Sequence, residues 1–577
     1  MHDAPASKSL NDVAHVASGP AEARTAPPRR PLRVGIVADS PRQPRWIAAA
    51  LSKACACGIA EIVVLAIGNA RPEQLPLAWR IYRFFEDRLT GAGGLSRLTQ
   101  LERRFAAPVI PLPADTRPAG IDAWRSTVAA FNLDVAFLLG AIDSGLVAGL
   151  ARFGSWRYAF GTPAHSRPEL VGVLEAARKD PIVASGLVAR SPEWGERHAC
   201  RSWARTHPCS VGRTRANALS KCEDFPVRAW RTVQERGADW LREAPEVRAE
   251  PTANLNRSLS LPALGSIGAR VAHRGFQKAL CLEQWFLAFR FGVHAGWASD
   301  LEEYHRVMPP TDRLWADPFP LARNGRHYIF FEEVPFASGR GRIVVTEVRR
   351  DGSWTEPVPV LERAYHLSYP FLIEWHGELF MIPETLQNRT VEIYRCIEFP
   401  GRWRLERVIL RDARYADATV HREADGWWMF VNIGHEGAEA YDELHLFHAN
   451  DLFADWRPHP RNPIKSDARA ARPAGRLFCA ESGLYRPAQI CAPLYGSGVS
   501  INRVIELTPR DYAEREVTRI VPAGNSGIVG LHTVNACGDL QVIDAFVRRS
   551  RFAAAAAQKK SKSPMTKYRS AMSRPPG

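Results

Sequence analysis

Residues 314–333, LWADPFPLARNGRHYIFFEE, carry a pattern that returns through the C-terminal half of the chain. Asp317 stands before a proline, Asn324-Gly325 predicts a tight turn, and residues 326–331 have the composition of a strand. A similar anchor, followed by strands and turns, recurs around Tyr369, Asp417, Arg472 and His532. The intervals between successive anchors are 52, 48, 55 and 60 residues. Five units of about 50 residues, each with several short strands, predict a five-bladed β-propeller.

A propeller ring has to close, and one strand stands before the first anchor. The stretch QWFLAFRFG, residues 284–292, has no partner within its own part of the sequence. We expect it to be the third strand of the fifth blade, so that strands from both ends of the propeller share one sheet and no blade keeps a long open edge.

The innermost strands of a propeller begin near the central channel, so the five anchors are expected to ring one mouth of it. Two aspartates, an arginine, a histidine and a tyrosine suit a ligand that has both hydroxyls and an anionic group. Trp315 and Tyr369 are expected as wall residues that can also stack on a sugar face. Glu333 and Glu384 end the second strands of their units and are candidates to face the channel. A purely structural role, in which Asp317 accepts backbone N–H bonds, stays open.

The first and third anchors resemble motifs of the five-bladed arabinanase, levansucrase and invertase class, especially the family-43 glycoside hydrolases. The resemblance covers roughly residues 280–546 and implies that Asp317 is a general base and that Asp417 tunes the pKa of the acid. Those enzymes carry a general-acid glutamate where this chain has Arg472, in AARPAGRLF. An arginine does not release a proton at neutral pH. Glu333, Glu384 and Glu481 are the candidate replacements, because hydrolysis needs two carboxyl groups.

A closer likeness joins WADPFP, HLSYPFLIE, PET, DATVH, ARPAG, RPAQ and GLHTVN. Together they resemble the N-terminal domain of plant glucosamine inositolphosphorylceramide transferases. The resemblance implies a role in glycan or glycolipid assembly, with a carbohydrate or glycolipid ligand at the propeller mouth. A phosphorylated ligand is one form of this expectation. Two alternatives remain: a family-43-type glycoside hydrolase with a displaced acid, and a non-catalytic glycan-binding scaffold.

The N-terminal third alternates strands and helices. LRVGIVAD (32–39), EIVVLAIG (61–68), DVAFLLG (134–140) and SWRYAFG (155–161) predict a parallel, doubly wound α/β sheet. No GxGxxG motif follows the first strand, so we expect no dinucleotide, and no other cofactor is indicated. Over residues 32–245 this order resembles the formyltransferase family. That family's Asn and first His are missing from YAFGTPAH, where His165 lies on a predicted loop, so formyl transfer is not expected.

Composition sets the domain boundaries. We expect a disordered leader at 1–31, a linker at 246–280, the propeller at 281–547 and a disordered basic tail at 548–577. The tail has nine Lys or Arg and no acid, which leaves 15 − 9 = +6 for the rest of the chain. The charge of this tail suits weak contact with an anionic membrane, a tail of no specific use stays open as the alternative, and no specific nucleic-acid binding is expected. Ten scattered cysteines without a CxxC pair indicate a reduced, cytoplasmic compartment and neither a metal site nor a disulfide framework.

Overall fold

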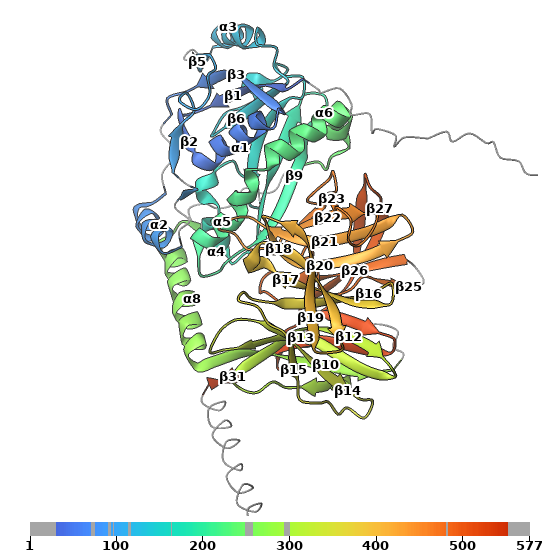
Figure 1. Cartoon of the computed structure of the whole chain (residues 1–577). Coiled ribbons are helices and arrows are strands. Elements are labelled where there is room, and N and C mark those ends of the chain that lie inside the picture. Colours follow the sequence, from blue (N-terminus) through green and yellow to red (C-terminus); the bar gives the residue numbers. More distant parts are fainter. Residues whose placement is uncertain are drawn as a thin grey trace, which may run out of the picture.

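The structure of the 577-residue chain is a computed structural model. It describes residues 30–70, 75–90, 94–95, 97–113, 117–162, 164–247, 258–292, 301–480, 483–524 and 526–551. Nearly all of the expected leader and of the expected basic tail lies outside these residues. The described part forms an α/β domain and a β-propeller, with helix α8 running along one side between them (Figure 1).

The propeller has five sheets, which confirms the predicted number of blades. The first two are β12 (Arg313–Arg323), β13 (Arg326–Pro335), β14 (Arg342–Val348) and β15 (Val358–Leu361), then β16 (Ser368–Trp375), β17 (Glu378–Thr385), β18 (Thr390–Glu398) and β19 (Arg402–Arg411). The third contains β20 (Arg414–Glu423), β21 (Gly426–Gly434), β22 (Glu443–Ala449), β23 (Arg457–Pro458) and β24 (Lys465–Ser466). The fourth contains β25 (Phe478–Ala480), β26 (Gly483–Ile490), β27 (Gly498–Leu507) and β28 (Tyr512–Ile520).

The fifth blade closes the ring with strands from both ends of the propeller. Its strands are β10 (Cys281–Phe291), β11 (His305–Val307), β29 (Ile528–Gly530), β30 (Val534–Cys537) and β31 (Leu540–Ser550). β10 pairs antiparallel with β31 along its whole length, from Cys281 opposite Ser550 to Phe291 opposite Leu540. Counted from β29, the sheet order β29-β31-β10-β11 makes β10 the third strand, so the predicted closure is confirmed. β10 and β31 thereby each have a partner strand on both sides.

The N-terminal domain is built on a seven-stranded sheet with order β5-β3-β1-β6-β7-β8-β9. The parallel part comprises β1 (Leu32–Ala38), β3 (Ala60–Ile67), β5 (Val109–Pro111), β6 (Val135–Leu139) and β7 (Ser155–Phe160). A long antiparallel hairpin, β8 (Ile182–Ser191) and β9 (Gly195–Arg205), extends this sheet, and the sequence did not reveal it. A short ribbon pairs β2 (Arg42–Pro44) with β4 (Leu98–Gln100).

Helices cover both faces of this sheet, as expected of a doubly wound arrangement. One apolar core includes Trp46 of α1 (Arg45–Ala56), Leu219 of α5 (Val211–Cys222) and Trp230 of α6 (Phe225–Glu243). A second core, on the other face, includes Trp124 of α3 (Pro118–Ala129). The remaining helical elements are α2 (Leu77–Thr90), α4 (Val173–Arg178), α8 (Leu261–Leu280) and the 3-10 turns η2 (Ser144–Val147), η3 (Pro168–Leu170), η4 (Leu301–Glu303) and η5 (Leu386–Asn388). The expected linker, 246–280, therefore contains the 20-residue helix α8. Among the described helices, none is long and apolar enough to cross a bilayer.

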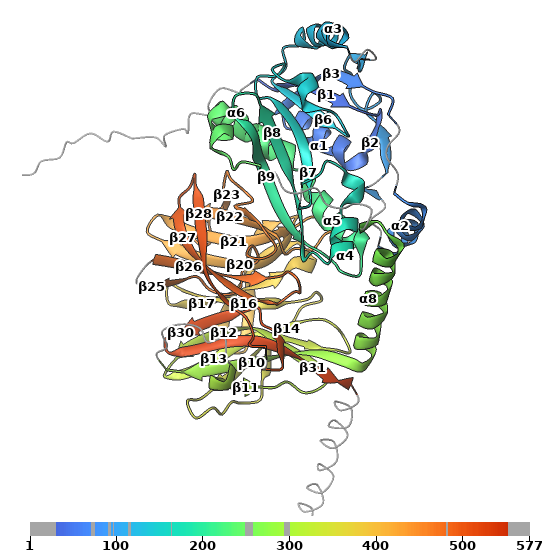
Figure 2. The same cartoon turned by 180° about the vertical axis from the view of Figure 1, so that it is seen from behind.

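Buried ion pairs fix the two domains against each other. Lys221 of α5 lies 2.5 Å from Asp442, and Arg228 of α6 donates to both oxygens of Glu443, at 2.7 and 3.0 Å. The backbone N–H of Ala468 donates to the carbonyl of Trp203 in β9 at 2.9 Å. Figure 2 shows β9 and α5 lying against the third and fourth blades. The α/β domain thus sits on a defined part of the propeller.

Candidate functional site

Three of the five anchors occupy the same unusual backbone position in successive blades. Asp317, Tyr369 and Asp417 have φ angles of 53°, 47° and 54°, in the left-handed region that non-glycine residues rarely adopt. In β12, β16 and β20 the strand pairing skips residues at these positions, as in a β-bulge. A bulge redirects the side chain that it carries. The repeated strain therefore belongs to a feature that points selected side chains away from the ordinary strand alternation.

Asp417 and Arg472 form the buried ionic centre of the site. The Arg472 guanidinium donates to the two Asp417 oxygens at 2.5 and 3.2 Å and to Glu384 at 3.1 Å. The Gln489 amide adds a hydrogen bond to Asp417 at 2.9 Å. Both Asp417 and Arg472 are buried. This network joins side chains from the second, third and fourth units, as the repeat predicted for Asp417 and Arg472.

Glu384 differs from the other carboxyl groups because its surroundings favour its neutral form. Burial and the neighbouring carboxylates of Asp417 and Asp317 raise its pKa well above the ordinary range, although Arg472 opposes the shift. A carboxyl group that stays protonated at neutral pH can donate a hydrogen bond or a proton. Glu384 is therefore a potential acid beside the Asp417–Arg472 pair.

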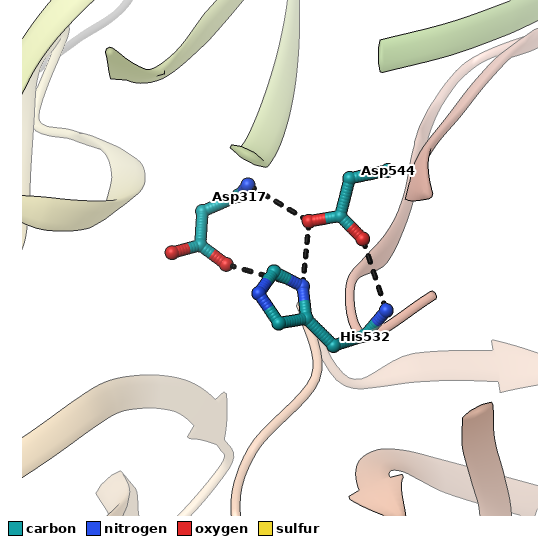
Figure 3. Close-up of side chains that lie close together, drawn as sticks. All are labelled: Asp317, His532 and Asp544. Carbon is teal, nitrogen blue, oxygen red and sulfur yellow. Dashed lines mark hydrogen bonds and ion pairs between the residues drawn. The ribbon is translucent and has the colours of Figure 1, made fainter. Parts of the chain in front are cut away.

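Asp544 holds the other half of the ring in place (Figure 3). One of its oxygens accepts from the backbone N–H groups of His532 and Thr533, at 3.0 and 2.9 Å. The other accepts from the backbone N–H of Asp317 at 2.9 Å and lies 2.6 Å from Nδ1 of His532. The Thr533 hydroxyl donates to Asp317 at 2.8 Å. The fifth blade thus fixes both the backbone and the side chain of the first anchor.

The protonation of Asp317 and His532 follows from this burial and pairing. Burial raises the pKa of Asp317 to about 7, reinforced by Asp417 and opposed by His532. Burial alone would lower the pKa of His532, but Asp544 and Asp317 raise it to about 9. Nδ1 of His532 lies 3.8 Å from Asp317. A buried carboxyl group that titrates near neutrality beside an imidazolium is suited to proton transfer.

Asp317, His532 and Asp544 lie close enough together to surround a metal ion. The hydrogen bonds argue for a different role. Both oxygens of Asp544 already accept two donors each, and a metal-ligating histidine has to be neutral, whereas the raised pKa of His532, about 9, favours its charged form at neutral pH. We therefore interpret the cluster as a hydrogen-bonded support for Asp317.

Aromatic rings surround the charged pairs. The buried Tyr369 hydroxyl shares a hydrogen bond with Thr419 at 2.8 Å and accepts from the backbone N–H of Gly475 at 2.8 Å, which ties three blades together. The Arg472 guanidinium lies 5.4 Å from the ring centre of Tyr441 and 5.5 Å from that of Tyr495. His532 stacks on another ring, that of Trp285, at 4.0 Å.

Two of the predicted substrate-binding residues belong to a separate cluster. Glu333 lies 3.0 Å from Arg313, 2.6 Å from Arg342 and accepts from the indole N–H of Trp315 at 3.0 Å. Burial would raise the pKa of Glu333, but these three donors hold it below its usual range. The Trp315 N–H is thus occupied by Glu333, and the carboxylate of Glu333 is occupied by Trp315 and the two arginines. Glu481, the third candidate acid, lies outside the described residues.

Sequence reasoning missed several partners of the anchors. Thr533 and Gln489 lie inside GLHTVN and RPAQ, two of the stretches that carry the family resemblance, whereas Asp544, Tyr441 and Tyr495 lie outside all of them. Among these last three, only Asp544 left a signal, because a lone carboxylate in the apolar strand LQVIDAFV requires buried hydrogen-bond donors. Tyr441 and Tyr495 carry no local mark of their role.

His165, the residue weighed for formyl transfer, is in the N-terminal domain. Its backbone forms a bridge with Phe160 at the end of β7, and its Nδ1 accepts from the backbone N–H of Arg167 at 3.2 Å. Burial, together with Arg178 and Arg167, lowers the pKa of His165 to about 4. A cavity of about 520 Å³ next to this loop is lined by Gly161, Thr162, His198 and Arg201, among others.

Comparison with known proteins concerns the propeller. Residues 307–531 match the family model "Glucosamine inositolphosphorylceramide transferase 1, N-terminal". The likeness lies within the propeller. The Arabidopsis thaliana protein of that name is 32% identical over 215 residues, covering 37% of this chain and 28% of the relative. The Oryza sativa subsp. japonica protein is 33% identical over 216 residues, covering 37% and 29%. The chain thus spans less than a third of the length of these curated relatives.

Solved structures include glycoside hydrolases at low similarity. Zg3597, a family 117 glycoside hydrolase of Zobellia galactanivorans, has a TM-score of 0.30 and 13% identity over 46% of this chain and 90% of its own. A GH43_1 enzyme from Xanthomonas citri has a TM-score of 0.31 and 11% identity over 41% and 87%. At these values the likenesses do not bear on activity.

Proposed function

We propose that this chain is a carbohydrate-active or sugar-binding protein of glycan or glycolipid assembly, with its ligand at the propeller mouth. The observation that carries the proposal is the convergence of Asp317, Asp417, Arg472 and His532, from four different blades, into two adjoining networks. The match of residues 307–531 to a family named for a glycolipid glycosyltransferase supports the class of ligand.

The chemistry of the networks supports a ligand with hydroxyl groups. Asp417 and Asp317 offer acceptors, while Arg472, His532 and protonated Glu384 offer donors. Tyr441 and Tyr495 add aromatic faces beside Arg472, of the kind on which sugar rings pack. A phosphorylated sugar is the version of this ligand that would compete for the Arg472 guanidinium.

A glycoside hydrolase with a displaced acid is the second candidate, and one observation favours it. Glu384 has a strongly raised pKa and interacts with both Asp417 and Asp317. Inverting hydrolysis needs one protonated and one ionised carboxyl on opposite sides of the sugar. In this version Glu384 donates the proton to the leaving group and Asp317 activates water.

The test begins with ligand binding by the full-length protein. Thermal unfolding is measured with nucleotide sugars, sugar phosphates and neutral glycans, and we expect one class to raise the Tm. A ligand at one hundred times its Kd stabilises the folded state by about 2.7 kcal/mol. Asp417→Asn should remove the shift. Asp455→Asn, at a fully exposed aspartate, is the control and should leave it intact.

Turnover then separates the candidates. Loss of turnover in Asp317→Asn with binding retained would identify an enzyme, whereas unchanged turnover would remove Asp317 from any catalytic role. For hydrolysis, Glu384→Gln should abolish glycoside cleavage while Glu333→Gln preserves it. If no carbohydrate shifts the Tm, or if Asp417→Asn leaves the shift unchanged, the proposed site is wrong.

We also propose a cytoplasmic location and a formyltransferase-like ancestry without formyl transfer for the N-terminal domain. The ten free cysteines support the first proposal. The strand order of the sheet and the place of His165 after β7 support the second.

A further inference from the structure

Helix α2 presents its apolar side to solvent. Its exposed positions recur at helical spacing and comprise Leu77, Arg80, Ile81, Phe84, Phe85, Arg88 and Leu89. Phe85 is 60% exposed and Leu89 87% exposed. Five of these seven side chains are large and apolar, and the other two are arginines. An ordinary surface helix has the opposite arrangement, with its apolar stripe toward the core.

The acids of α2 lie on its inner side. Glu86 is buried, and Asp87 pairs with the buried Arg215 of α5. The apolar contact with the domain is made chiefly by Trp79, which is 1% exposed. The outward face of α2 therefore combines hydrophobic side chains with positive charge and has no carboxylate among its exposed positions.

Helix α8 continues this character. It contains Arg270, Arg274 and Lys278 at four-residue spacing and no Asp or Glu between residues 261 and 280. Leu261, Val271 and Phe276 are exposed, Phe276 by 64%. Eight of the eighteen large apolar side chains exposed in the described structure lie on these two helices. Such a concentration marks an interaction surface rather than scattered surface residues.

The two helices are neighbours at the margin of the molecule. The indole N–H of Trp79 in α2 donates to the carbonyl of Leu259, just before α8, at 2.9 Å. Trp79 and Ile267 of α8 belong to one buried apolar cluster. Figures 1 and 2 both place α2 beside the N-terminal end of α8, along the same outer edge. We call their exposed apolar and basic side chains the α2–α8 face.

A basic cavity lies at the C-terminal end of α8. It has a volume of about 470 Å³, and its charged lining comprises Arg270, Arg274, Lys278, Arg548, Arg551 and a single carboxylate, Glu283. Glu283 already accepts from Arg548 at 3.4 Å. The cavity therefore keeps an excess of positive charge, which suits the phosphate of a lipid headgroup.

We propose that the α2–α8 face docks on an anionic lipid bilayer, with the apolar side chains entering the interface and the basic cavity receiving lipid phosphate. Apolar helices flanked by Arg and Lys bind membranes in this way. A second copy of the chain is the less suitable occupant, because a symmetric contact would bring the same positive side chains together. The inference does not depend on a ligand at the propeller mouth.

The apolar part is tested by vesicle flotation with the full-length protein. We expect flotation with vesicles containing 30% phosphatidylglycerol in phosphatidylcholine, and at least about tenfold weaker partitioning to pure phosphatidylcholine. Phe84→Ser, Phe85→Ser and Leu89→Ser together should lower partitioning to the anionic vesicles by roughly tenfold or more. A matched variant with Leu405→Ser, Ile505→Ser and Val517→Ser, at exposed apolar side chains of the propeller, should float like the wild type.

The charged part is tested by Arg274→Gln with Lys278→Gln, which should weaken flotation at 0.1 M salt. Its control, Arg402→Gln with Arg404→Gln, removes the same charge at exposed positions of β19 and should have little effect. The basic C-terminal residues are present in every variant, so they cannot account for these differences. Equal flotation of the α2 triple variant and the wild type would overturn the proposal. So would a wild-type dimer by light scattering that the triple variant converts to monomer while neither protein floats.

Discussion

At the scale of the residue, Asp544 determines how the first and fifth anchors behave. Its carboxylate, buried in β31, organises the backbone of Asp317 and holds the His532 ring. His532 is consequently charged in the folded protein well above the pH at which a free histidine loses its proton. This coupling makes the stability of the propeller dependent on pH.

His532 has a folded pKa of about 9 and an unfolded pKa near 6.5, so its stabilising contribution is fully present below about pH 6.5 and is lost as the pH rises through 9. We expect the free energy of unfolding to fall over this window, with roughly 2–3 kcal/mol as the upper limit of the His532 share. His532→Gln should flatten the decline measured by urea unfolding at pH 6.5 and 9. His376→Gln, at an exposed histidine, should not. Parallel pH profiles of the wild type and His532→Gln would refute this assignment.

The sequence could predict the anchors but not their partners. Asp317, Asp417 and Arg472 are recognisable because they occupy equivalent positions of a repeat, and a repeat places equivalent positions around one axis. Gln489 and Tyr495 have no such register, since they contact the site through strands and loops that differ between blades. Glu333 shows the converse, because it ends a strand as Glu384 does, yet neighbouring arginines and Trp315 engage it.

At the scale of the element, the approach of the fourth blade to the fifth depends on a glycine. Gly475 has a φ of 129°, and a Cβ atom placed there would lie 2.1 Å from the carbonyl oxygen of Val534 in β30. Gly483 has the same φ, but its nearest neighbour would be the Arg503 side chain at 3.6 Å. The two positions share a φ that side chains rarely adopt and differ in crowding.

Gly475→Ala should therefore destabilise the protein more than Gly483→Ala. The strain of the unusual φ costs about 1–3 kcal/mol at either position. At Gly475 the clash with backbone adds to it, since blade 4 has to move away from blade 5. Chemical denaturation of both variants gives the comparison, and equal losses of stability would show that the two blades do not pack this tightly.

Strand elements were predictable where alternation or a turn marked them, and less so elsewhere. β9, GERHACRSWAR, is rich in Arg and polar residues because it is the edge strand of the sheet and meets the propeller through polar contacts, such as Ser202 with Ser466 and Arg205 with Glu439. α8 contains three glycines, which lower helix propensity, so its residues look like a linker. Contacts with α2 and α4 at its first turns favour the helix over that propensity.

At the scale of the whole molecule, Glu443 connects the two domains. It is fully buried and bonds with Arg228 of α6, with His435 at 2.7 Å and with Ser466 at 3.1 Å. Burial alone would raise the pKa of Glu443, but Arg228 and His435 hold it well below its usual range. Its contribution is therefore present at neutral pH and is lost only in acid.

Glu443→Gln should loosen the domain interface, because it leaves the part-buried Arg228 with only the more distant Asp224, at 3.5 Å, as a counter-charge, at a cost of at most about 3–5 kcal/mol. We expect calorimetry to show one transition for the wild type and two for the variant, as the domains unfold separately. Glu398→Gln, at an exposed pair with Arg402, should keep the single transition. A single, unshifted transition in Glu443→Gln would mean that the interface contributes little. No sequence feature foretold this pairing, since its members lie more than 200 residues apart.

The closing of the ring by β10 and β31 has a mechanical consequence. Cys281 and Ser550, where the chain enters and leaves this pair, lie opposite each other at the same end of an antiparallel ladder. A force pulling α8 away from the C-terminus would thus peel the ladder open one hydrogen bond at a time instead of shearing all of its bonds together. If α8 is held on a surface while the C-terminus is pulled, the β10–β31 pair is the first part of the propeller to open.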